Sequence, residues 1–163
     1  MAFFLFIGFI VLLRMAELII ASRNEKWMLQ QGAIEFGKSH YPFMVAMHTL
    51  FFVSLLLEYI FRTPVNYVLE AIIIYMLLIL LKTWVIFSLG KYWNTKILRI
   101  PNAALVNKGL YKFIKLPNYI IVIIEIALIP LSFHLYFTAI TFSILNAAML
   151  YVRIRTENKA LNN

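Results

Sequence analysis

The chain has 163 residues, of which 63% are hydrophobic and only 13% are charged. A soluble domain is roughly 45–50% apolar and about 25% charged, so the composition excludes an ordinary soluble fold and indicates an integral membrane protein. The absence of cysteine excludes disulfides, thiolate nucleophiles and cysteine-ligated metals. The net charge of +8 does not indicate nucleic-acid binding, because the basic residues lie between apolar runs. We expect anionic membrane lipid as the partner instead.

Five apolar runs can form helices across a hydrocarbon core of roughly 30 Å. They cover residues 2–21, 43–61, 66–89, 117–132 and 135–152. The first run has no basic segment before it and no clear cleavage site after it, so we expect a mature helix rather than a signal peptide. The fourth run is short, which also allows a tight helical hairpin with the fifth around Ser132 to His134. The sequence predicts an all-α, polytopic membrane protein with one domain over residues 1–163.

The basic residues outside these spans are distributed asymmetrically. Twelve of them lie in loops 21–42 and 90–116 and in the tail after residue 152, whereas only Arg62 lies on the other side. Because basic loops tend to stay in the cytoplasm, we expect the N-terminus outside and the C-terminus inside, with a bacterial cell membrane as the location. The long polar segments then share the cytoplasmic face, where we expect an active site to open.

Several charged residues lie inside the predicted spans, where an unpaired charge is costly. Arg14 and Glu17 are three residues apart, so they can pair on one helix face. Lys82 is two turns from the end of its span, and we expect it to snorkel to the interface. Glu125 lies in an otherwise apolar run and needs a partner or a polar ligand, which makes it a candidate catalytic residue.

Four other polar residues carry weaker indications. Glu58 and Glu70 lie near the outer ends of their spans, where we expect them to reach water. Neither His48 nor His134 has a second histidine, aspartate or glutamate at the spacing of metal ligands. No metal site is therefore predicted.

The segment from Gly90 to Glu125 is the most informative part of the chain. Aromatic, glycine and basic residues alternate in it, and an unstructured loop of 27 residues, 90–116, usually binds or covers something. Three motifs lie here and a fourth in the tail: Gly90-Lys91-Tyr92-Trp93, Leu105-Val106-x-x-Gly109-x-Tyr111, Lys115-Leu116-Pro117-Asn118-Tyr119 and Arg153-x-x-x-Glu157-Asn158-x-x-Leu161.

In order and spacing, these motifs resemble those of the isoprenylcysteine carboxyl methyltransferase family and its phospholipid methyltransferase relatives, most strongly over residues 88–161. Segments 24–27 and 31–33 resemble the bacterial branch. The resemblance implies an integral-membrane, S-adenosylmethionine-dependent O-methyltransferase that acts at the cytoplasmic face. It also implies a lipophilic acceptor, either an alkylpyrone-like enol or phenol or an isoprenylcysteine-like carboxylate.

The resemblance further assigns roles to individual residues. It implies that the cofactor is held by Tyr111, Lys115, Pro117, Asn118, Tyr119 and Glu157. Arg153 joins Glu125 as a catalytic candidate, because it can orient Glu157 or attract an anionic acceptor. These residue types suit the chemistry, since aromatic faces favour a sulfonium, basic groups favour a carboxylate, and methyl transfer needs alignment and exclusion of water rather than a metal.

Two positions depart from the family pattern. The family's Arg-His before the proline is Lys115-Leu116, and its second tail glutamate is Asn158. Because that histidine helps to hold the cofactor in the family, Leu116 makes a non-catalytic scaffold one alternative. A small-molecule transporter or a lipid-binding protein is another, indicated by the charged residues inside the spans. The sequence does not indicate an oligomeric state.

Overall fold

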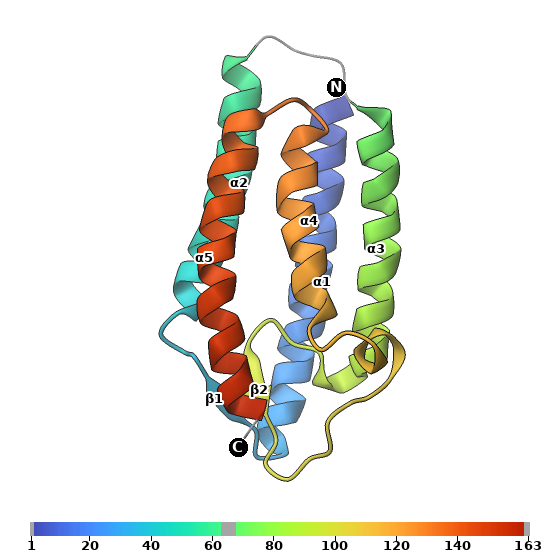
Figure 1. Cartoon of the computed structure of the whole chain (residues 1–163), viewed down its shortest axis with the longest axis vertical. Coiled ribbons are helices and arrows are strands. Elements are labelled where there is room, and N and C mark those ends of the chain that lie inside the picture. The colour runs from blue at the N-terminus through green and yellow to red at the C-terminus, as the bar shows by residue number, and fades with distance from the viewer. Residues whose placement is uncertain (1, 63–67, 162–163) are drawn as a thin grey trace.

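The computed structural model describes residues 2–62 and 68–161 and shows a bundle of five helices (Figure 1). The helices are α1 (Ala2–Gln30), α2 (Tyr41–Phe61), α3 (Leu69–Leu89), α4 (Pro117–Leu131) and α5 (Tyr136–Leu161). Four of them are long and apolar enough to cross a membrane, and α4 is a shorter apolar helix. The predicted all-α, polytopic membrane fold is therefore confirmed.

The helix boundaries differ from the predicted spans at two places. α1 continues to Gln30 and α5 to Leu161, well beyond the predicted ends at residues 21 and 152. The prediction followed hydropathy, but a helix continues into water wherever its residues favour helical backbone, and both extensions are rich in such residues. The segment predicted as a C-terminal tail is thus the last part of α5. Residues 66 and 67 of the third predicted span lie outside the described residues.

The predicted hairpin between α4 and α5 is also confirmed. Pro130 lies one residue before the end of α4, and the backbone reverses so that Leu135 N donates to Pro130 O at 2.9 Å. His134 adopts a positive φ of 57° in this turn. At about 1.5 Å per residue, the 15 residues of α4 span only about 22 Å. α4 therefore relies on its contacts with α3 and α5, against which it packs closely.

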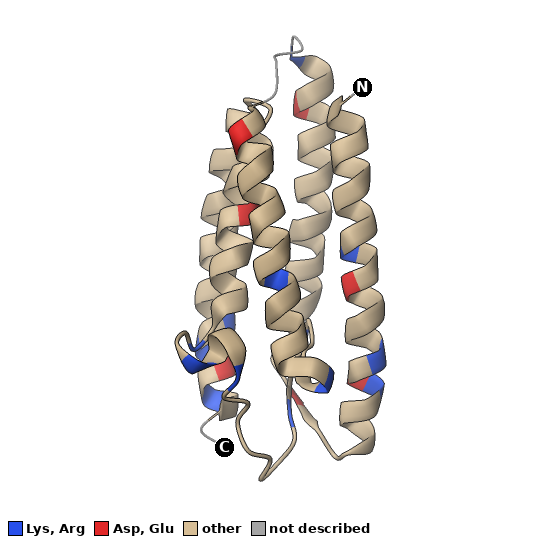
Figure 2. Cartoon of the chain, turned by 90° about the vertical axis from the view of Figure 1, so that its right-hand side faces the viewer, with Lys and Arg blue, Asp and Glu red and all other residues tan. Residues whose placement is uncertain are grey.

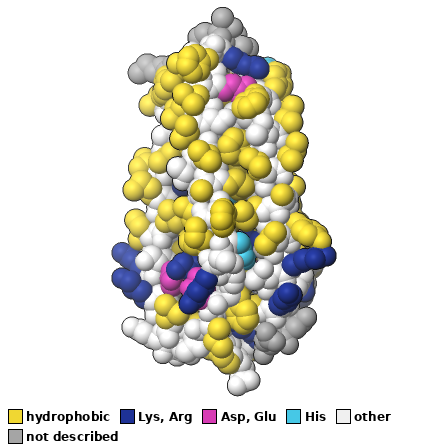
Figure 3. All heavy atoms as spheres, turned by 90° about the vertical axis from the view of Figure 1, so that its left-hand side faces the viewer, with side chains coloured by type: hydrophobic (Ala, Val, Ile, Leu, Met, Phe, Trp, Pro, Cys, Tyr) yellow, Lys and Arg dark blue, Asp and Glu magenta, His cyan; other side chains and the backbone are white. Residues whose placement is uncertain are grey.

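The two ends of the bundle differ in structure. The N-terminus and the α4–α5 turn lie at one end, which we call the turn end, and the short elements between the helices lie at the other, which we call the loop end (Figure 1). Charged residues are sparse in the middle of the helices and gather at the loop end (Figure 2). On the face shown in Figure 3, hydrophobic side chains are spread over the surface between the ends, as expected of helices in contact with lipid.

Aromatic side chains fill the turn end. The aromatic cluster consists of Phe3, Phe6, Tyr59, Tyr75 and Phe133. The rings of Phe3 and Tyr59 stack with their centroids 3.7 Å apart, and Phe133 packs edge-on to Phe3 at 5.0 Å. These contacts bring α1, α2 and α3 together with the turn after α4. Because lipid is as apolar as the side chains themselves, close packing of this kind is what holds helices together in a membrane.

The predicted unstructured loop contains several short elements at the loop end. They are the 3-10 helices η1 (Gly90–Tyr92) and η2 (Gly109–Lys112) and the strand β2 (Ile97–Arg99). β2 pairs antiparallel with β1 (Ile34–Phe36), which lies between α1 and α2. Hydropathy does not reveal this sheet, because its strands have three residues each and gain their stability from long-range pairing.

The extension of α1 fixes this loop in place. Asn24 donates hydrogen bonds to the carbonyl oxygens of Gly90 at 3.1 Å and Trp93 at 2.7 Å. Asn94 donates in return to Ala21 O at 3.1 Å. The protruding part of α1 therefore serves as a support for the segment that follows α3.

Gly109, which belongs to one of the sequence motifs, fits its position for a steric reason. Its φ of +56° is a conformation that residues with a Cβ rarely adopt, and a Cβ here would lie 2.0 Å from Ser88 Oγ. The glycine therefore lets η2 pack directly against the end of α3.

Four charged side chains inside the bundle form one ion cluster: Arg14, Glu17, Lys82 and Glu125. Arg14 bridges Glu17 at 2.9 Å and Glu125 at 2.7 Å, which confirms the predicted pairing of Arg14 with Glu17. The Lys82 ammonium lies 3.1 Å from Glu17 and 3.0 Å from Glu125. The expectation that Lys82 snorkels to the interface is therefore wrong: the residue is 4% exposed, because two carboxylates inside the bundle compensate its charge.

The prediction that Glu58 reaches water is also wrong. The side chain of Glu58 is 7% exposed, and its carboxylate accepts hydrogen bonds from the backbone N–H groups of Phe137 at 3.1 Å and Thr138 at 2.7 Å. These N–H groups belong to the first turn of α5 and have no intrahelical acceptor. Glu58 therefore caps α5 from a neighbouring helix. Glu70, in contrast, is exposed as predicted.

Candidate functional site

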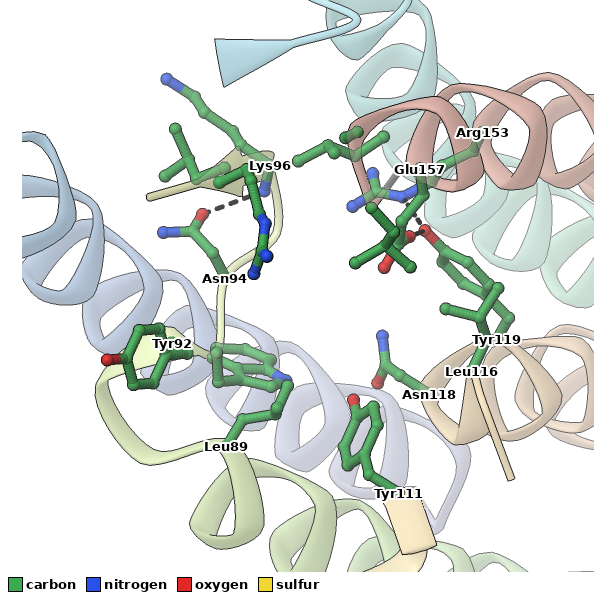
Figure 4. A pocket seen from close by; sticks show the side chains of 16 residues that line it. Leu89, Tyr92, Asn94, Lys96, Tyr111, Leu116, Asn118, Tyr119, Arg153 and Glu157 are labelled. Atoms are coloured by element: carbon green, nitrogen blue, oxygen red, sulfur yellow. Dashed lines mark hydrogen bonds between the residues drawn. The ribbon is translucent and has the colours of Figure 1, made fainter. Parts of the chain in front are cut away.

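A cavity at the loop end is enclosed by the start of α4, the last turns of α5 and the segment that leads from α3 to β2 (Figure 4). Its volume is about 110 Å³. A neighbouring cavity of about 390 Å³ shares Tyr111, Leu116 and Glu157 with it and continues beneath the loop before η2. We call these two adjoining spaces the loop-end cavity.

A chain of hydrogen bonds joins α4 to α5 along the wall of this cavity. The Tyr119 hydroxyl donates to the Glu157 carboxylate, and Arg153 Nε donates to the same hydroxyl at 2.8 Å. Arg153 also donates to Met44 Sδ at 2.7 Å and to the backbone carbonyl of Thr95. Arg153 therefore holds Tyr119 in position and ties α5 to α2 and to the loop.

Two buried polar atoms in the lining have no hydrogen-bond partner among residues 2–62 and 68–161: Asn118 Oδ1 and Arg99 Nε. Figure 4 shows Asn118 extending from the start of α4 toward the cavity. Burying a polar atom without a partner is costly. One free acceptor and one free donor in the same cavity therefore suit a ligand that carries both kinds of group.

Tyr111 closes another side of the loop-end cavity (Figure 4). Burial raises the pKa of its phenol well above the ordinary value, and the nearby Glu157 carboxylate raises this pKa further. Tyr111 therefore remains protonated at neutral pH and presents a hydrogen-bond donor together with an aromatic face.

The two departures from the family pattern meet in space. Lys115 Nζ donates to Asn158 Oδ1 at 2.9 Å. Leu116 precedes the first turn of α4 without a side-chain cap and places an apolar side chain in the cavity wall. Pro117 begins α4, where its missing N–H is costless. The hydrogen bond between the Lys115 ammonium and the Asn158 amide thus links the loop to α5.

The structure brings most of the predicted site residues together. Around the loop-end cavity lie Tyr111, Lys115, Asn118, Tyr119, Arg153 and Glu157. Pro117 is buried at the start of α4, where it favours the beginning of the helix and does not itself line the cavity. Glu125 lies further along α4, in the ion cluster. Arg99 also lines the cavity, although the sequence indicates only that it is one of the basic residues of loop 90–116. No motif in its neighbourhood predicts a cavity residue.

An inner cavity of about 90 Å³ continues from the loop-end cavity into the bundle. The two share Tyr119, Asn118 and Arg153, and the inner cavity reaches Arg14 and Lys82 of the ion cluster. A third space of about 220 Å³, which we call the lateral groove, lies between α1 and α2 and has a largely apolar lining. The inner cavity and the lateral groove share Arg14, Glu17, Met44 and His48, so the three spaces adjoin one another in series.

The sequence profile of the Isoprenylcysteine carboxyl methyltransferase (ICMT) family matches residues 71–163, which include most of α3, all of α4 and α5 and nearly all residues that line the loop-end cavity. The chain is 47% identical over 161 residues to the uncharacterized protein YpbQ of Bacillus subtilis, covering 98% of this chain and 96% of that one. It is 27% identical over 159 residues to an uncharacterized protein of Haemophilus influenzae, covering 94% and 91% of the two chains. No solved structure matches significantly. The chain therefore belongs to the isoprenylcysteine carboxyl methyltransferase family, a family of membrane methyltransferases.

Proposed function

We propose that the protein is an S-adenosylmethionine-dependent O-methyltransferase that modifies a lipophilic acceptor at the cytoplasmic face of a bacterial membrane. One observation carries the proposal: the loop that leads into α4 and the end of α5 enclose a common cavity, in which Asn118 Oδ1 and Arg99 Nε lie buried without partners. Family membership supports the reaction type.

The residues in the loop-end cavity fit the cofactor. Arg99 Nε can donate to its carboxylate, and Asn118 Oδ1 can accept from its ammonium group. Glu157, oriented by Tyr119, can accept from ribose hydroxyls or the adenine amine. The aromatic faces of Tyr111 and Tyr119 favour a sulfonium. When bound, S-adenosylmethionine supplies the methyl group, already activated for displacement.

The chain itself supplies alignment and exclusion of water. Arg153 and Glu157 fix Tyr119 from both sides of its hydroxyl. The apolar side chain of Leu116 limits water in the cavity wall. Orientation of this kind contributes much of the catalysis in displacement reactions, because the reacting atoms meet without an entropic search.

The inner cavity supports an acceptor with an oxygen nucleophile. Its lining includes Arg14, Lys82 and Glu17 of the ion cluster, in which Glu17 and Glu125 balance the two cations, and a third cation, Arg153. Arg153 donates its hydrogen bonds to neutral groups, and its positive charge favours an enolate, phenolate or carboxylate over a protonated amine. The apolar lateral groove can hold a hydrocarbon chain. An alkylpyrone-like enol or phenol is the preferred acceptor, with an isoprenylcysteine-like carboxylate as the alternative.

Binding of S-adenosylmethionine to the purified protein, measured by calorimetry in detergent, tests this proposal. We expect saturable binding by the wild type and at least tenfold weaker binding by Glu157→Ala and Tyr119→Ala. Glu70→Gln is the control, because Glu70 is exposed at the turn end of α3. Absence of wild-type binding at millimolar cofactor would contradict the proposal.

Leu116→His tests the alternative of a non-catalytic scaffold. If the chain has lost cofactor binding through Leu116, histidine at this position should restore it. If the apolar wall belongs to a working site, the wild type already binds and the substitution gives no gain. Extraction of lipids from cells fed methyl-labelled methionine, with and without the protein, would identify the acceptor.

Transport or retention of a lipophilic ligand is the second candidate function. The largely apolar lateral groove, which contacts the ion cluster through Arg14 and Glu17, favours it. This function predicts ligand flux or retention that depends on the ion cluster and is indifferent to S-adenosylmethionine.

A further inference from the structure

His48, on α2, lines both the inner cavity and the lateral groove. It therefore lies where the head of an acceptor held in the groove would approach the space bounded by Tyr119 and Arg153. No role for His48 is predicted from the sequence, because no second metal-binding side chain lies at ligand spacing from it.

The hydrogen bonding of His48 defines which ring nitrogen has no partner in the protein. Nδ1 lies 2.8 Å from the backbone carbonyl oxygen of Met44. A carbonyl oxygen can only accept, so Nδ1 carries a proton. In the neutral imidazole, Nε2 is then an acceptor with a free lone pair. Within residues 2–62 and 68–161, Nε2 forms no hydrogen bond.

The other titratable groups of the inner cavity already have partners. Arg14 and Lys82 are bound to both carboxylates of the ion cluster, Glu17 and Glu125. On α5 and α4, Arg153 and Tyr119 take part in the hydrogen bonds that lead to Glu157. In the lateral groove, the Tyr41 hydroxyl is paired with Thr95 at 3.2 Å. His48 Nε2 is thus the uncommitted basic atom of these two spaces.

We propose that His48 is the general base of the methyl transfer and that its use selects weakly acidic hydroxyl acceptors, such as long-chain phenols or enols. This inference rests on the proposed function. Nε2 takes the hydroxyl proton while the acceptor oxygen forms a bond to the methyl carbon. The bond from that carbon to sulfur breaks, its electron pair stays on sulfur as a thioether, and the imidazolium later releases its proton to water.

The surroundings of His48 match this role. Leu18, Val45 and Phe52 line the lateral groove beside it and can hold a hydrocarbon chain. Arg153 lines the inner cavity and donates its hydrogen bonds to neutral groups, so its positive charge can stabilise negative charge that develops on the acceptor oxygen. A carboxylate arrives already ionised and needs no base. A hydroxyl acceptor needs a base and a carboxylate does not, so the free base favours the phenol or enol class over the carboxylate class of acceptor.

Two long-chain phenols of the same chain length test the inference. One is a plain alkylphenol, and the other carries nitro groups that keep it ionised at the assay pH. We expect His48→Gln to lower kcat/KM for the plain phenol about 100-fold. For the nitro compound, we expect kcat/KM to change by less than about threefold. Raising the pH should restore the variant's activity on the plain phenol. Equal losses on both phenols would overturn the inference.

A measurement without turnover separates this inference from the proposed function. In nitrogen-labelled protein, the imidazole resonances absent from His48→Gln belong to His48. We expect a neutral ring protonated at Nδ1, with an Nε2 signal that shifts when the plain phenol binds. A doubly protonated ring, or an unchanged signal at saturating phenol, would overturn it. His134→Asn is the control, because His134 lies in the α4–α5 turn at the opposite end of the bundle. Failure of the wild type to bind S-adenosylmethionine would count instead against the proposed function.

Discussion

The turn end and the loop end of the same bundle are stabilised in different ways. At the turn end, aromatic rings from several helices pack against one another, as between Phe3 and Tyr59. At the loop end, hydrogen bonds and short elements connect the helices around cavities whose lining contains unpartnered polar atoms. The ion cluster lies between them. The comparison indicates that one end of the bundle is built for close packing, whereas the other contains the cavities of the proposed binding site.

Breaking the ion cluster should have the largest effect on stability. Glu125→Ala leaves Arg14 and Lys82 inside the bundle with only Glu17 as a counter-charge. We expect a loss of about 3–5 kcal/mol in the free energy of unfolding, as for other buried ion pairs that lose one partner. Denaturant unfolding in detergent measures it, with Glu70→Gln as the control. If Glu125→Ala keeps its stability but loses methyl transfer, the residue is catalytic rather than structural.

Removing one ring from the aromatic cluster should destabilise the turn end alone. Phe133 is 4% exposed and packs against Phe3 and Phe6. Phe133→Ala creates a void, and we expect it to cost about 3 kcal/mol of unfolding free energy. The affinity for S-adenosylmethionine in the folded fraction should stay within about twofold. A tenfold loss of affinity would show that the two ends are not separable.

Removing one hydroxyl at the loop end should weaken cofactor binding, which removing a ring at the turn end should not. Tyr119→Phe keeps the ring but breaks the link between Arg153 and Glu157. We expect cofactor affinity to fall about tenfold because Glu157 is no longer oriented, and the free energy of unfolding to fall by about 1–1.5 kcal/mol for each of the two lost hydrogen bonds. Tyr151→Phe, on the exposed surface of α5, is the matched control. Equal affinities of Tyr119→Phe and the wild type would contradict the role of Tyr119.

The smallest expected effect is a pH dependence at the loop end. Burial lowers the pKa of His40, which precedes α2, and the Arg153 guanidinium lowers it further. The unfolded chain therefore takes up the proton more readily, so stability is lost as the pH falls below the ordinary histidine pKa of about 6.5. We expect His40→Gln to lose less stability than the wild type between pH 7 and pH 5 in parallel denaturant titrations. Identical losses would show that His40 does not cause this pH dependence of stability.

The sequence predicted the parts of the molecule that depend on local pattern. Apolar runs located the five helices, and the motifs around Pro117 and Glu157 identified two segments that enclose one cavity. It did not predict the partners of Lys82 or the position of Arg99. Both depend on how helices rotate and how distant strands pair, which no local pattern encodes. Hydropathy also ended α1 and α5 too early, because the helices continue beyond the apolar residues.

Photo-crosslinking with radiolabelled S-adenosylmethionine, followed by peptide mapping, tests the central claim most directly. We predict label on the segment between Trp93 and Tyr119 or on the last turns of α5 near Glu157, with protection by unlabelled cofactor. Label confined to the turn-end halves of α1, α2 and α3, or label that unlabelled cofactor does not displace, would contradict a methyl-donor site at the loop end.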